Sequence, residues 1–370
     1  MPHTAQNISE TDAGDIAPRI RPAATESLAV RAARAAAIAA EHANGVDAEA
    51  RFPAEALNAL KQENLLGIMV PAALGGEGAS VSDVTDICYG LGRVCSSTGM
   101  IFAMHQVKAA CIVHHGTASA WHRDFMRRMA QDQLLLASST TEGKGGGNVR
   151  ASEAAVESTD GRIMLVRDAS VISYGAQADA VVTTARRGAD ADASDQVLVV
   201  FEKKNYVLEK TGGWETLGMR GTCSAGFSLK AIGIPAQIMP IAYGIIHSQT
   251  MVPSAHLMWA GVWAGIAAGA VERARKFMRK AQRTGNLPPG VPHFVEAQAG
   301  LRALRALIGA MLARHEAIAD DPQALGAIDF QTAINLLKVD ASELAVKTVM
   351  NAMRATGLSG YRNDGDASIG

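Results

Sequence analysis

The chain has 370 residues and a formal net charge of −1, from 35 basic and 36 acidic side chains. This balance argues against a nucleic-acid-binding protein, which normally carries an excess of Lys and Arg. Because 48% of the residues are hydrophobic and 19% charged, the chain is too apolar for a disordered protein and has enough apolar surface for a sizeable core.

The N-terminal residues 1–24 lack the apolar stretch of a secretory signal and predict a disordered lead-in. The most apolar stretch, residues 257–271, is shorter than the roughly 20 residues that a membrane span needs. We therefore expect a cytoplasmic protein without a membrane span. The cysteines form no CxxC pair, which argues against a disulfide framework and against a metal site.

Hydrophobic periodicity changes twice along the chain. Apolar residues recur at helical spacing near the start, as at Leu28, Ala32 and Ala35. The middle instead has short apolar runs separated by turns such as Thr159-Asp160-Gly161, which is typical of β-hairpins. The last third contains long apolar segments that predict an antiparallel helix bundle.

The sequence thus predicts an α+β fold with an ordered succession of domains. They are a disordered lead-in at 1–24, an N-terminal helical domain at 25–132, a small β-barrel or sandwich at 133–242 and a C-terminal long-helix bundle at 243–370.

Several motifs in this order resemble the acyl-CoA dehydrogenase superfamily, which includes related flavin monooxygenases. Phe52-Pro53, Val70-Pro71 and Gly75-Gly76-x-Gly78 are similar to the N-terminal pattern of that family. Leu217-Gly218-Met219-Arg220 is similar to the segment that ends its β-domain. The resemblance implies a flavoprotein oxidoreductase with FAD as its cofactor.

Two segments resemble the part of the family that holds the flavin ring. Thr141-Glu142 opens a Gly-rich segment similar to the family's Thr-Glu-Pro-x-x-Gly-Ser-Asp, and Val171-Ile172-Ser173 is similar to its Trp-Ile-Thr. Glycines let backbone N–H groups approach a ligand closely, and hydroxyls bind a polar ring edge. The cofactor contacts implied here are Ser139, Thr141, Gly146, Gly147 and Ser173.

The C-terminal bundle carries the residues that, by resemblance, meet the cofactor of a neighbouring subunit. Arg283 corresponds to an Arg that reaches the FAD pyrophosphate of the partner, and Gln298 and Gly357 are implied to contact the same cofactor. A planar guanidinium suits phosphate because it forms bidentate bonds. We therefore expect a homotetramer or homodimer.

The catalytic base of the family, a Glu, has no counterpart in this sequence, either after Tyr361 or near His256. Three functions therefore stay open. The first is an FAD-dependent acyl-CoA dehydrogenase-like oxidoreductase that acts on the CH–CH group of an acyl thioester, on CoA or a carrier protein, and uses an electron-transfer flavoprotein. The second is a flavin-dependent monooxygenase of the same fold that depends on a flavin reductase. The third is a non-catalytic flavin-binding subunit.

His105 is the candidate acid–base group for the monooxygenase hypothesis. Histidine can donate a proton to a flavin hydroperoxide or accept one from a substrate near neutral pH. The competing interpretation is a buried structural histidine.

Overall fold

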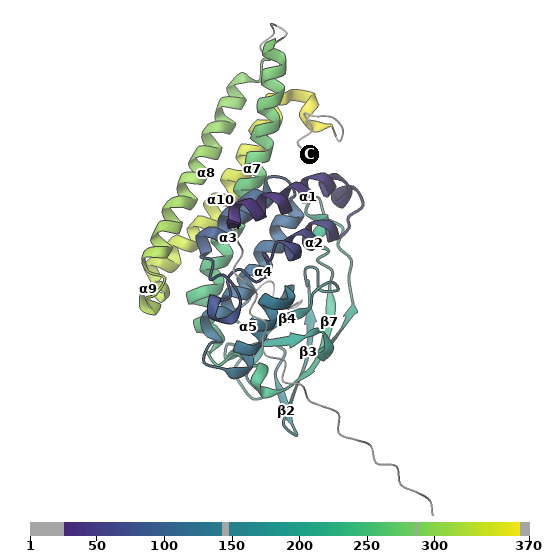
Figure 1. Cartoon of the computed structure of the whole chain (residues 1–370), viewed down its shortest axis with the longest axis vertical. Helices are drawn as coiled ribbons and strands as arrows, with labels where there is room; N and C mark the ends of the chain where they lie inside the picture. The colour runs from purple at the N-terminus through teal and green to yellow at the C-terminus, as the bar shows by residue number, and fades with distance from the viewer. Residues whose placement is uncertain (1–25, 143–147, 284, 286–287, 363–370) are drawn as a thin grey trace, which may run out of the picture.

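The computed structural model describes residues 26–142, 148–283, 285 and 288–362. Its order of helices, small sheets and long helices confirms the predicted fold class (Figure 1). The boundaries between the domains stay a prediction.

The N-terminal part is helical, as its periodicity indicates. Ser27 caps the first helix by accepting a hydrogen bond from the backbone N–H of Val30, and Ser80 forms a capping box with Asp83. The helices are α1 (Leu28–Ala48), α2 (Ala54–Gln62), α3 (Val81–Gly92), α4 (Ser96–His115) and α5 (Ala120–Asp132), with a short 3-10 turn η1 (Ala72–Leu74) between α2 and α3.

Among the described residues, the middle of the chain forms a three-stranded sheet in the order β1-β4-β5 and a four-stranded sheet in the order β2-β3-β7-β6. The β1–β4 pair is parallel and the other pairs are antiparallel. The strands are β1 (Leu136–Ser139), β2 (Glu157–Thr159), β3 (Arg162–Ala169), β4 (Ala180–Arg186), β5 (Gln196–Glu202), β6 (Tyr206–Lys210) and β7 (Phe227–Gly233). Short 3-10 turns η2 (Lys203–Asn205), η3 (Arg220–Thr222) and η4 (Pro235–Gln237) lie between them.

Buried side chains of the two sheets belong to one core, so the β-region has the arrangement of a sandwich. The residues of strand β3 alternate between exposed and buried. The side chains of Ile163, Leu165 and Arg167 therefore all point into this core. Two of these side chains are apolar, but the third is a guanidinium.

The C-terminal part consists of α6 (Tyr243–Ile246), a π-helical turn η5 (His247–Met251), α7 (Val252–Arg283), α8 (Val291–Ala317), α9 (Pro322–Gly326), α10 (Ile328–Thr356) and a 3-10 turn η6 (Gly357–Tyr361). The long helices α7, α8 and α10 lie side by side, and the end of α7 and the start of α8 extend past the rest of the molecule (Figure 1). The run Tyr243–Arg283 is long and apolar enough to cross a membrane, but 78% of its most apolar window is buried in the protein. This burial is that of a core helix.

Glycines bring α3 and α7 into backbone contact. Gly261, Gly265 and Gly269 follow one face of α7, because they are spaced by four residues. A Cβ at Gly265 would collide with the carbonyl oxygen of Tyr89, and one at Gly92 of α3 would collide with that of Val262. Only a residue without a side chain allows this approach.

Replacing Gly265 by Ala should therefore lower the free energy of unfolding by about 1–3 kcal/mol, because the helices must move apart. The measurement is urea denaturation followed by circular dichroism. Gly90→Ala is the matched control, since a Cβ there meets no atom within 4 Å, and it should leave stability unchanged or raise it by roughly 0.5–1 kcal/mol. Equal effects of the two substitutions would contradict the packing argument.

Candidate functional site

Side-chain hydroxyls gather where β1 and β3 end. At the end of β1, the hydroxyl oxygens of Ser138, within the strand, and Thr140, just after it, lie 3.4 Å apart. The hydroxyl of Ser170, which follows β3, donates to Thr141 Oγ1 over 3.5 Å. The structure thus brings together the two segments that were predicted to hold a flavin ring, although they are far apart in the sequence.

Ser173 begins a chain of hydroxyl groups. Its Oγ lies 2.8 Å from Ser224 Oγ, which lies 2.8 Å from Thr222 Oγ1. The hydroxyl of Thr222 donates to the carbonyl of Met219, so in this arrangement Ser224 donates to Thr222 and Ser173 donates to Ser224. An acceptor on a ligand would compete with Ser224 for the proton of Ser173.

An ion pair fixes the residue that precedes the undescribed Gly-rich segment. A carboxylate oxygen of Glu142 lies 3.2 Å from Nη1 of Arg167, and their side chains are 8% and 0% exposed. The same carboxylate accepts from the backbone N–H groups of Glu153 and Ala154 at 2.6 Å and 3.1 Å. The carboxylate of Glu142 is therefore fully engaged, and it links the segment after β1 to β3 and to the backbone of Glu153 and Ala154.

The predicted contacts Gly146 and Gly147 lie outside the described residues. Ser139 is buried, its carbonyl accepts a hydrogen bond from Thr183, and its hydroxyl has no partner among the described residues. The half-buried hydroxyls of Ser138 and Thr140 lie on the opposite face of the strand. Sequence reasoning missed these two residues, because a shift of one position in a strand selects the other face.

His105 is held by the backbone on both sides of its ring. The side chain is fully buried; Nε2 lies 2.8 Å from the carbonyl oxygen of Leu66, and Nδ1 accepts from the backbone N–H of Leu136 at 3.0 Å. These partners require a neutral ring with the proton on Nε2. Burial lowers the pKa of His105 to about 4. With both nitrogens occupied, the geometry gives His105 a structural role and does not support the catalytic assignment.

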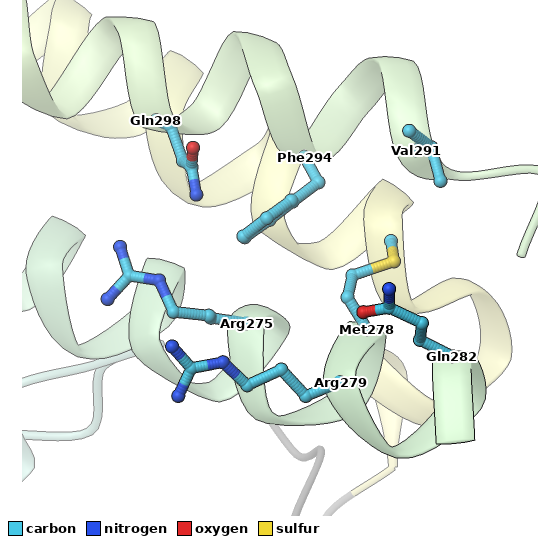
Figure 2. Close-up of a pocket in the computed structure, with 7 residues that line it drawn as sticks. All are labelled: Arg275, Met278, Arg279, Gln282, Val291, Phe294 and Gln298. Carbon is cyan, nitrogen blue, oxygen red and sulfur yellow. The ribbon is translucent and has the colours of Figure 1, made fainter. Parts of the chain in front are cut away.

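The C-terminal bundle contains a second candidate site, a pocket of about 350 Å³ between α7 and α8. In Figure 2, Arg275 and Arg279 extend side by side from α7, while Phe294 and Gln298 point from α8 toward them. Met278, Gln282 and Val291 complete the lining. Two guanidinium groups beside an aromatic ring suit a phosphate next to a flat base.

The three residues predicted in this region, Gln298, Arg283 and Gly357, differ in where they lie relative to this pocket. Gln298 lines the pocket, whereas Arg283 is exposed at the end of α7 and is not part of the lining. Arg279, one helical turn earlier, is among the lining residues. Gly357 follows the last residue of α10 and has a φ of +58°. Two residues before it, Ala355 lies against Gly290 at the start of α8, since a Cβ at Gly290 would meet the carbonyl oxygen of Ala355. Gly357 therefore lies at the same end of the bundle.

Sequence profiles of two domains match most of the chain. The acyl-CoA dehydrogenase N-terminal domain matches residues 25–133, and the acyl-CoA dehydrogenase C-terminal domain matches residues 244–368.

Individual relatives are distant. Cyclohex-1-ene-1-carbonyl-CoA dehydrogenase of Geobacter metallireducens is 25% identical over 59% of this chain and 54% of its own length. A probable acyl-CoA dehydrogenase of Bacillus subtilis matches over 52% of its length, so the chain spans about half of these two relatives. The amino sugar nitrososynthase DnmZ of Streptomyces peucetius is 24% identical over 86% of this chain and 80% of that protein.

Solved structures share the fold. FMN-bound TdsC from Paenibacillus, a dibenzothiophene monooxygenase, has a TM-score of 0.79 and 17% identity, with 90% of this chain and 88% of that chain covered. A nitrososynthase from Micromonospora carbonacea has a TM-score of 0.78 and 20% identity, with 94% and 91% covered.

The buried histidine generates a pH prediction. The pKa of His105 in the folded protein lies below its ordinary value of 6.5, so the unfolded chain takes up a proton first as the pH falls. The contribution of neutral His105 to the free energy of unfolding is therefore fully present above about pH 6.5. It is lost between pH 6.5 and pH 4, by at most roughly 1.4 kcal/mol per pH unit.

His105→Gln removes that titration and should make the loss of stability between pH 7 and pH 5 shallower, as measured by urea unfolding at several pH values. At pH 7 the same variant should be less stable by about 1–3 kcal/mol, because Gln cannot satisfy both backbone partners. An unchanged pH slope would mean that His105 is not a buried neutral ring.

Proposed function

This chain belongs to the acyl-CoA dehydrogenase family, and from that membership we propose that it oxidises the CH–CH group of an acyl thioester with a bound flavin. Members of the family are flavoprotein oxidoreductases, and a flavin supplies a two-electron acceptor when it is bound. The observation that carries the proposal is the pairing of the Thr141 segment with the Ser170–Ser173 segment at one edge of the sandwich.

The residues at this edge fit a flavin ring. The half-buried side chain of Thr141 and the exposed one of Ser170 offer hydroxyls for a polar ring edge, and Val171, which follows Ser170 and is 36% exposed, offers an apolar contact. The hydroxyl of Ser173 would give up its hydrogen bond to Ser224 and donate to a ring atom instead. In this role it orients the ring and holds a proton where charge develops.

We propose FAD as the particular flavin, on the basis of the α7–α8 pocket. Arg275 and Arg279 would bind its phosphates, and Phe294 would pack on its adenine. The pocket lies at the protruding end of α7 and α8, whereas the hydroxyl-rich edge belongs to the sheets (Figure 1). One FAD would therefore place its flavin ring at the hydroxyl-rich edge of one copy, and its phosphates and adenine in the α7–α8 pocket of another copy.

A homo-oligomer agrees with the surface of α10. Exposed apolar side chains follow one another along this helix at Leu336, Val339, Val346 and Met350, with exposed fractions of 54%, 49%, 64% and 37%. A second copy would cover such a stripe. An electron-transfer flavoprotein would be the electron partner, and the cytoplasm is the proposed location.

A second candidate, a flavin-dependent monooxygenase supplied by a flavin reductase, is favoured by one observation. Removal of an α-proton needs a free carboxylate base in a dry site. Glu142, the carboxylate next to Thr141, is not free for this role, because Arg167 and two backbone N–H groups already bind it.

Anaerobic titration of the purified flavoprotein with a panel of acyl-CoA thioesters tests the reaction. Bleaching of the visible flavin band is expected for the dehydrogenase, and Ser173→Ala should slow it about fivefold, the equivalent of one hydrogen bond of about 1 kcal/mol. Ser158→Ala on the exposed strand β2 is the control. A flavin that no thioester bleaches, but that turns over with reductase and oxygen, would favour the monooxygenase; a flavin inert in both assays would favour a non-catalytic subunit.

The choice of flavin has its own test. Arg279→Ala should weaken FAD retention about tenfold, because a charge-assisted phosphate contact contributes roughly 1.5–3 kcal/mol, and should leave FMN binding unchanged. Flavin content after gel filtration gives the answer, with Lys280→Ala on the exposed surface of α7 as the control. Equal loss of FMN and FAD would place Arg279 outside a dinucleotide site.

A further inference from the structure

A lysine on α4 is buried, and the residues that the structure describes offer it no anionic partner. Lys108 is 3% exposed, and in the described part of the chain the acceptor within reach of its Nζ is the sulfur of Met251, at 3.2 Å. A thioether is a weak acceptor, whereas an ammonium group has three protons to donate. Lys61, by contrast, lies at the surface and pairs with Asp179 at 3.1 Å.

The groups facing Lys108 from the C-terminal part are donors as well. The hydroxyl of Tyr243 donates to the same sulfur of Met251 over 3.7 Å. The half-buried ring of His247 packs edge-on against Tyr243, with centroids 5.5 Å apart. Both His247 and Met251 belong to the π-helical turn η5, a conformation that is frequent at functional sites.

A further cationic side chain near Lys108 comes from the sandwich. Arg167 of β3 is 1% exposed and binds Glu142 and the carbonyl of Thr184 through Nη1, but its Nε and Nη2 have no partner among the described residues. Burial lowers the pKa of Lys108, and the nearby charge of Arg167 lowers it further, against an opposing effect of Cys111. Of these two buried cationic side chains, Arg167 pairs with the carboxylate of Glu142, and in the described part of the chain Lys108 has no such pair.

Burying charge and N–H groups without acceptors destabilises a fold. A bound acceptor with a negative charge would remove that penalty. The cluster brings together residues of α4, of β3 and of the α6–η5 segment, which are far apart in the sequence.

We infer that this junction binds a negatively charged oxygen group of a small molecule, a carboxylate or a phosphate, with Lys108 as its direct contact. This inference rests on the proposed function, because the molecule would be the substrate of the same flavin-dependent reaction. The unpartnered Nε and Nη2 of Arg167 would supply additional positive potential, and Tyr243 a further donor.

The test measures binding of benzoate, inorganic phosphate and neutral benzamide to the full-length protein by thermal shift and calorimetry. Benzoate or phosphate should raise the melting temperature, and benzamide should not. A response to benzoate alone would identify the group as a carboxylate, and a response to phosphate alone would identify it as a phosphate. Binding should also take up protons from the buffer, since the anion favours the charged form of Lys108.

Variants at Lys108 decide whether this residue is responsible. Lys108→Met should reduce the affinity for the anion at least tenfold, while Lys108→Arg should retain most of it. The control is Lys204→Met, because the side chain of Lys204 is 75% exposed. Without ligand, Lys108→Met should melt at the same temperature as the wild type or higher, whereas a purely structural lysine would give a lower temperature.

Three results would overturn the inference: neither anion binds the wild type, benzamide binds as well as benzoate, or Lys108→Met keeps its affinity. If Lys108→Met does not fold, an equal loss of affinity in folded Lys108→Arg and Lys108→Gln would likewise refute a charge contact. Flavin absorbance is recorded for each protein. A wild type without flavin counts against the proposed function, while bound flavin with unaltered anion affinity in Lys108→Met counts only against this subsite.

Discussion

The backbone contact between α3 and α7 is the constraint on which the rest of the structure depends. It joins helices that are more than 150 residues apart in the sequence, and it requires glycine at positions such as Gly92 and Gly265. With α3 and α7 in contact, α4 lies against both α7 and the π-helical turn η5. The Lys108 cluster therefore takes its geometry from residues that touch no ligand. The 36 glycines of the chain include several that serve packing of this kind.

Buried polar groups in this protein fall into two kinds that differ in how their hydrogen bonds are satisfied. His105 has a backbone partner for each ring nitrogen, so its burial contributes to one defined arrangement of α4 beside β1. Lys108 lies one turn further along the same helix, and its acceptor in the described ranges is only the sulfur atom of Met251. This contrast separates a polar side chain that supports the fold from one whose burial the fold itself does not explain.

Much of the architecture could be predicted from local pattern, because periodicity and turn residues act over a few positions. The strands β3 and β7 and the long helices fall close to the segments that their apolar spacing indicates. The site was harder to predict. Arg283 and Arg279 are equivalent by pattern, and only the packing of α8 on α7 shows which guanidinium reaches the pocket. Likewise, nothing local shows that Arg167 turns inward, since the alternation of β3 would suit an apolar residue there.

The π-helical turn before α7 has a consequence for how this family member tolerates change. Such a turn amounts to one extra residue accommodated within an otherwise continuous helix. Loss of a single codon between His247 and Met251 would allow the segment to relax into an ordinary α-helix, and the residues on either side would keep nearly the same register, because the turn already absorbs the extra residue. The change would fall on the turn itself, where His247 packs against Tyr243 and Met251 provides the sulfur that Tyr243 and Lys108 share. A one-residue deletion here would therefore alter the buried cluster and leave α7 in place.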